Sequence, residues 1–204
     1  MRYSIAAENW AQLAACLPHL VFHIHPALRA PPSTTRPVDL SAALSTLSLT
    51  PLPPLPPAQV LFLGLYLTYL TTHLSDLPSF RSVLATSLPS APSPLPAPLA
   101  LAHAIYAALL SSNHLALSRI LAPILAPPTS TDSNWEESDS SADERLQLAI
   151  VVGALPKLRE QVWRPLERSY KTFTDLAWLA RVLLFPPGEE GETAVKEFLV
   201  AKGK

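Results

Sequence analysis

The chain of 204 residues is 49% hydrophobic and only 15% charged, and its net charge is −1. This length allows one domain or two small ones with a substantial core, and the near-neutral charge argues against a strongly basic nucleic-acid-binding protein. Soluble proteins usually carry charge on about a quarter of their residues. Either partners therefore cover part of the apolar surface, or the composition is biased toward Leu, Ala, Ser and Pro.

Helical spacing of apolar residues dominates the chain from its first residues, and no strand-like alternation of useful length interrupts it. We therefore expect an all-α fold. Three N-terminal helices are predicted within residues 1–49, over 3–17, 18–28 and 39–47. The single cysteine, Cys16, excludes an internal disulfide and fits a reducing compartment. Because it lies in an apolar helical pattern, we interpret it as a buried core residue.

Residues 50–57 are rich in proline and predict a stiff polyproline linker, although their PxxP patterns would also suit an SH3-like domain. A helical-repeat array is expected over residues 57–126. Its helices are predicted at 57–74, 77–88, 98–111 and 114–125, with Pro57, Asp76 and Asn113 at the starts of the first, second and fourth. The two helix pairs resemble tetratricopeptide-like stacking.

Residues 58–74 are the strongest candidate for a membrane span. Three threonines and a histidine interrupt this stretch, and its clean apolar run is shorter than the ~20 residues that a span requires. We interpret it as a buried helix and expect no membrane contact.

Residues 127–143 are acidic and rich in serine, and they predict a flexible loop. The C-terminal helices follow over residues 144–204. Ser141 and Glu144 match a capping box, Pro156 is expected to start a new helix, and Pro165 is expected to kink it. Thr174 is the predicted N-cap of a helix over 175–185, and a last helix is predicted over 189–202. This succession is typical of a winged-helix unit without a complete wing.

Residue patterns that carry chemistry are missing from the sequence. No phosphate-binding loop, nucleophile elbow or zinc-protease motif occurs. His23 and His25 have no Cys, Asp or Glu at ligand spacing, whereas zinc needs three or four ligands. We therefore expect no metal site, no cofactor, no small-molecule substrate and no catalytic residue, and an enzyme is the disfavoured hypothesis.

Basic residues gather in the last third of the chain, where 10 of the 15 lie from Arg145 onward. Four of them form a predicted basic edge: Arg159, Arg164, Arg168 and Lys171. This edge is either a solvated face or a binding surface for a protein partner. Among the nearby aromatic residues, Trp178 and Phe185 are interpreted as core.

Three stretches carry a resemblance to a known family: "LFLGLYLTYL", "LALAHAIYAALLSSNHLALSRIL" and "LREQVW…RSYKTFTDLAWLA…ETAVKEFLVAKG". Together, over residues 57–202, they resemble the PCI scaffold family. The likeness is to the branch of the smallest COP signalosome subunit, a proteasome-lid subunit and subunit k of translation initiation factor three. The family usually adds β-strands for a wing, whereas this sequence stops at Lys204, where those strands would be expected. This difference puts sheet-mediated assembly with neighbouring PCI subunits in doubt.

This resemblance implies a non-catalytic scaffold of a multisubunit complex, COP-signalosome-like, in cytoplasm and nucleus. The partners would be other subunits, and the removal of a ubiquitin-like modifier from cullins would reside in another subunit. The opening "MRYSIAAENWAQLAACLPHL" and "AWLARVLLF" are also similar to GANP-type messenger-RNA export scaffolds. That likeness implies an RNA-associated adaptor, although the near-neutral charge makes nucleic-acid binding the less favoured hypothesis.

Overall fold

Helices account for all regular structure in the computed structural model, which describes residues 9–24, 56–88, 94–125, 139–170 and 172–203. Eight α-helices and two π-helical turns occur in these ranges, and no strand. The predicted all-α fold is therefore confirmed for the described residues. The predicted helix over 39–47, residues 50–55 of the Pro-rich linker, and most of the acidic loop lie outside them.

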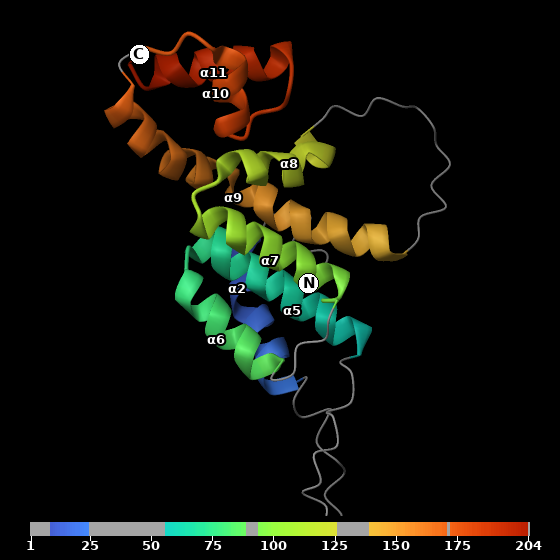
Figure 1. Ribbon diagram of the computed structural model, residues 1–204. Coiled ribbons are helices and arrows are strands. Elements are labelled where there is room, and N and C mark those ends of the chain that lie inside the picture. Colours follow the sequence, from blue (N-terminus) through green and yellow to red (C-terminus); the bar gives the residue numbers. More distant parts are fainter. Residues whose placement is uncertain (1–8, 25–55, 89–93, 126–138, 171, 204) are drawn as a thin grey trace, which may run out of the picture.

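The order of the elements follows the chain (Figure 1). They are α2 (Trp10–His19), η1 (Leu20–Ile24), α5 (Pro57–Tyr69), η2 (Leu70–Leu74), α6 (Leu77–Ser87), α7 (Ala97–Leu110), α8 (His114–Leu125), α9 (Asp139–Ser169), α10 (Leu176–Val182) and α11 (Glu189–Ala201). In Figure 1, α10 and α11 lie at one end of α9, away from α6 and α2.

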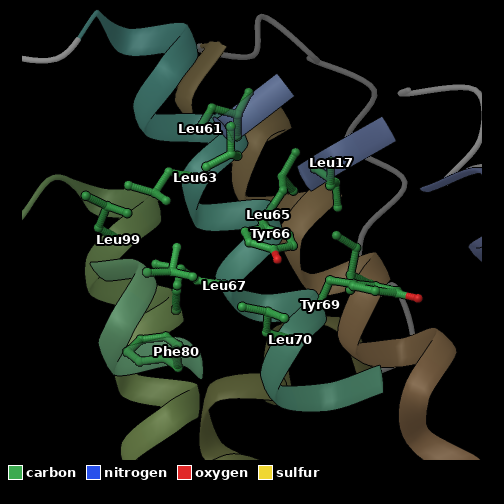
Figure 2. Close-up of a cluster of buried hydrophobic side chains, with 14 of the residues drawn as sticks. Leu17, Leu61, Leu63, Leu65, Tyr66, Leu67, Tyr69, Leu70, Phe80 and Leu99 are labelled. Carbon is green, nitrogen blue, oxygen red and sulfur yellow. The ribbon is translucent and has the colours of Figure 1, made fainter. Parts of the chain in front are cut away.

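The described residues form three hydrophobic clusters, and the first of them, called the first core below, is centred on helix α5. Helix α5 is its centre because it contacts α2, α6, α7 and α9. Its residues are apolar on every side, which is the pattern of a buried helix. Figure 2 shows its side chains pointing both toward Phe80 and Leu99 and toward Leu17. These positions are almost inaccessible, with Leu67 and Leu17 at 0% exposure. The buried-helix interpretation of residues 58–74 is confirmed, and no helix of the described segments is long and apolar enough to cross a membrane.

The threonine hydroxyls inside this core are satisfied locally. The Thr68 hydroxyl donates to the Gly64 carbonyl at 2.9 Å, and the hydroxyls of Thr71 and Thr72 donate to the Thr68 carbonyl at 2.9 and 2.8 Å. Such bonds to the preceding turn let threonine occupy a buried helix. Gln147 of α9 then donates from Nε2 to Thr68 Oγ1 and to the Pro98 carbonyl, both at 2.8 Å. One side chain thus connects α9 to α5 and α7.

Three predicted helix starts are confirmed because their signals are local. Helix α5 begins at Pro57, the Asp76 carboxylate accepts from Ser79 N at 3.1 Å, and Asn113 Oδ1 accepts from Ala116 N at 3.0 Å. The Thr174 prediction is wrong by one residue. Asp175 caps α10 instead, since its carboxylate accepts from Trp178 N at 2.8 Å.

The N-terminal helix differs from its prediction in two respects. Helix α2 continues through Pro18 and leads into the π-helical turn η1, so Pro18 starts no separate helix. Cys16 is exposed, not buried as predicted. The helix presents Leu13 and Leu17 to the core, both at 0% exposure. Cys16 lies three residues from Leu13, but it directly precedes Leu17 and therefore falls about 100° from it, on the solvent side.

Helix α9 runs without interruption over 31 residues, roughly 45 Å, although Pro156 and Pro165 lie inside it. The predicted helix start at Pro156 is therefore wrong, and residues 139–143 of the predicted acidic loop are helical. A proline removes one helical hydrogen bond and crowds the preceding turn. Burial outweighs this cost, because the neighbours Ala154, Leu155 and Leu158 are at most 5% exposed. Helix α9 contributes to all three hydrophobic clusters of the described structure.

Helix α2 docks on α9 through Trp10 and Gly153. The Trp10 ring lies 4.5 Å from the His73 ring, centroid to centroid. A Cβ added at Gly153 would lie 2.0 Å from Trp10 Cζ2. Tertiary packing, and not backbone conformation, therefore selects glycine here.

We expect Gly153→Ala to destabilise the protein by about 1–3 kcal/mol, because the indole ring must be displaced. The sign of this change in the free energy of unfolding tests the contact with Trp10, since alanine inside an ordinary helix stabilises by about 1 kcal/mol relative to glycine. Urea unfolding measures the change. In a Trp10→Ala background the same substitution should become neutral or stabilising. If Gly153→Ala stabilises the chain even with Trp10 present, this packing is wrong.

Candidate protein-interaction surface

One face of α9 carries four long polar side chains, at positions 157, 161, 164 and 168. Their spacing of four, three and four residues keeps them on the same side of a helix. The first two are engaged with the end of η2: Lys157 Nζ donates to the His73 carbonyl, and Gln161 Nε2 donates to Ser75 Oγ at 2.9 Å. They fasten α9 to the first core.

Arg164 and Arg168 continue this face beyond the contacts with η2, and both are exposed. Neither guanidinium has a hydrogen bond or ion pair with another described residue. We call these two residues the exposed arginine pair. Because Lys157 and Gln161 anchor α9 just before them, the pair is presented on a fixed helix and not on a loop.

Arg159 belongs elsewhere, although the sequence placed it on the same edge. Five residues separate it from Arg164, which corresponds to about 140° around the helix. Its Nε donates to the Leu183 carbonyl at 3.1 Å and its Nη2 donates to the Leu184 carbonyl at 3.0 Å. The guanidinium carbon also lies 3.9 Å from the centroid of the Phe185 ring. Burial lowers the pKa of Arg159 from its ordinary value.

The turn that Arg159 holds has an unusual backbone. Leu184 adopts a left-handed conformation, φ 59°, which favours glycine. Its N–H donates to the Arg181 carbonyl, and the N–H of Phe185 donates to the Ala180 carbonyl at 2.9 Å, so a Schellman motif ends α10. The Leu184 side chain is completely buried against residues of α8 and α9. Arg159 therefore positions the C-terminal helices, and among the described residues of the basic edge only Arg164 and Arg168 are solvent-facing. Lys171 lies outside the described residues.

The C-terminal helices pack around an aromatic cluster. Trp163 is 2% exposed and lies 5.5 Å, centroid to centroid, from both Phe173 and Phe198. Trp178 and Phe185, predicted as core, are only partly buried at the edge of this cluster. Glu160 and Lys202 form an ion pair that ties the end of α11 to α9. Helices α10 and α11 thus form a packed unit with the end of α9, the helix that carries Arg164 and Arg168.

Sequence reasoning missed the roles of Lys157 and Gln161, and it grouped Arg159 with the wrong side. The helical spacing within α9 contains this information, because positions 157, 161, 164 and 168 share a face from which position 159 is excluded. This spacing can be read only if α9 is known to be one helix, and Pro156 and Pro165 predicted an interruption instead. In the described ranges no three His, Cys, Asp or Glu side chains converge in a way that could hold a metal ion.

Comparisons of the chain with protein-family models, with curated proteins and with solved structures found no match.

Proposed function

We propose that this chain is a non-catalytic scaffold subunit of a multisubunit complex of the PCI type. Within that class we propose a COP-signalosome-like complex, acting on cullins in cytoplasm and nucleus through another subunit. The observation that carries the proposal is the exposed arginine pair on a face of α9 whose other two long polar side chains, Lys157 and Gln161, are engaged with the end of η2. The resemblance of residues 57–202 to the PCI scaffold family supplies the class of complex.

The exposed arginine pair suits an acidic face of a helical partner. Arginine is among the residue types that dominate protein interfaces, because its planar guanidinium binds carboxylates through paired hydrogen bonds. A rigid helix reduces the entropy lost on binding. Charges at the rim of an interface act mainly on the association rate and on its salt dependence. The proposed role of the pair is therefore to steer and orient a neighbouring subunit.

Reversing the pair with Arg164→Glu/Arg168→Glu should slow assembly by about tenfold at low salt, with a smaller effect at high salt. The measurement is quantitative recovery of partner subunits from a native extract by the immobilised chain, at two salt concentrations. Arg81→Glu/Arg119→Glu is the matched control, because these arginines are exposed on α6 and α8. Circular dichroism checks the fold of each variant. If both double variants recover the partner subunits equally at low salt, Arg164 and Arg168 are only part of a solvated face and do not bind a partner.

An RNA-associated adaptor of the GANP type is the second candidate. Tyr170 is 48% exposed and follows Arg168 closely in the chain. An aromatic ring and guanidinium groups are the elements that bind single-stranded nucleic acid. Two arginines and Lys171 would neutralise at most about three phosphates, so log affinity would fall with log salt at a slope of roughly −2. Fluorescence anisotropy with a single-stranded RNA across salt concentrations distinguishes this candidate from the scaffold.

A further inference from the structure

His73 lies at a junction where distant parts of the chain meet. It belongs to η2, and its ring lies against the Trp10 ring of α2 and the Tyr69 ring of α5, with centroid distances of 4.5 and 5.0 Å. Its Nε2 lies 2.8 Å from the Ile150 carbonyl of α9, and its own carbonyl accepts a hydrogen bond from Lys157 Nζ. One partly buried, titratable ring therefore contributes to the contact of α2 with η2 and α9.

The hydrogen bond to Ile150 fixes the tautomer of the neutral His73 ring. A carbonyl oxygen can only accept, so Nε2 carries a proton and a second proton must bind at Nδ1. Protonation therefore keeps this bond and adds a positive charge to a ring that is partly shielded from water. Burial lowers the pKa of His73 from its ordinary value of 6.5, the bond to Ile150 opposes this shift, and the Lys157 ammonium adds to it.

The elements around the ring supply little negative charge to compensate. The described residues of α2, η1, α5 and α7 include no Asp, Glu, Lys or Arg. Asp76, which precedes α6, caps that helix by accepting from Ser79 N at 3.1 Å. The aromatic faces of Trp10 and Tyr69 attract a cation and offset part of the cost. Besides Tyr69, the titratable residues of α2, η1, α5 and α7 are Cys16, His19, His23, Tyr66, His103 and Tyr106.

We propose that His73 makes the docking of α2 dependent on pH, and that proton uptake by its ring loosens the Trp10 end of α2 from η2 and α9. This end of the helix is the part that can open, because Leu13 and Leu17 are completely buried and hold the rest of α2 in the first core. A histidine whose pKa is lowered by docking binds its proton more readily in the open state, so acid favours opening. The contact is complete above pH 6.5 and weakens as the pH falls below that value.

Nuclear magnetic resonance of the full chain measures the titration of His73 directly. The midpoint of its imidazole resonances should lie below 6.5, because the docked ring resists protonation. A midpoint at or above 6.5 would overturn the proposal. This measurement uses the parent protein and depends on no variant.

Hydrogen exchange of the same protein, corrected for the intrinsic effect of pH on exchange, locates the opening. Between about pH 7.5 and pH 5.5, the protection of the first turns of α2 should fall several-fold, and that of α7 should change less. His73→Gln keeps a side-chain N–H donor but cannot take up a proton in this range, so α2 should lose less protection than in the parent. His103→Gln is the matched control, because His103 is exposed on α7, and α2 should respond in it as in the parent. Equal loss of protection in α2 of the parent and of His73→Gln would overturn the proposal as well.

Discussion

Replacing Trp163 by alanine lowers the free energy of unfolding by about 3–5 kcal/mol, the cost of removing a large aromatic side chain from a packed core. Trp163 is 2% exposed and is held between Phe173 and Phe198. The cavity cannot close easily, because the α9 backbone is fixed on one side by Arg159 and on the other by Lys157 and Gln161. The third hydrophobic cluster, which surrounds Trp163, should lose most of its stability.

Urea unfolding followed by circular dichroism measures this loss, with Trp178→Ala as the matched control. Trp178 packs at the edge of the same cluster and is only partly buried, so its truncation should cost clearly less. Trp163→Phe keeps an aromatic side chain and removes a buried indole N–H that has no partner among the described residues. It should therefore be milder than Trp163→Ala. A larger loss for Trp178→Ala than for Trp163→Ala would contradict this packing.

Arg159→Ala should destabilise the chain by about 2–4 kcal/mol, because two carbonyls at the end of α10 lose charged hydrogen-bond donors. These carbonyls belong to Leu183 and Leu184, whose side chains are completely buried. Water therefore reaches the turn poorly. The contact of the guanidinium with the Phe185 ring is lost at the same time.

Arg164→Ala is the control for Arg159→Ala, since it removes the same side chain from the exposed face of the same helix. Its free energy of unfolding should stay within about 0.5 kcal/mol of the parent. Thermal and urea unfolding of the three proteins decide the matter. Equal stability of Arg159→Ala and Arg164→Ala would return Arg159 to the solvent-exposed basic edge.

Features with local causes could be predicted from the sequence. Pro57, Asp76 and Asn113 mark helix starts because the proline ring or a side-chain oxygen acts within one turn. The central position of α5 follows from a segment that is apolar all round. These signals require no knowledge of distant parts of the chain.

Features that depend on distant contacts could not be predicted. The continuity of α9 through Pro156 and Pro165 results from packing against segments far away in the sequence, as in the bond from Lys157 to His73. The wrong grouping of Arg159 with Arg164 has the same cause, because the faces on which these two residues lie are defined only when α9 is one continuous helix. The difference between Trp163 and Trp178 likewise depends on where Phe173 and Phe198 lie.

Purification of the tagged full chain from its native cells, with quantitative mass spectrometry after size-exclusion chromatography, tests the central claim most directly. The scaffold proposal predicts that the chain elutes with several other subunits at near-equal ratios, PCI-type scaffolds among them. It also predicts that the purified complex removes a ubiquitin-like modifier from cullins. Elution of the chain alone, with no protein in stoichiometric amount, would contradict the account.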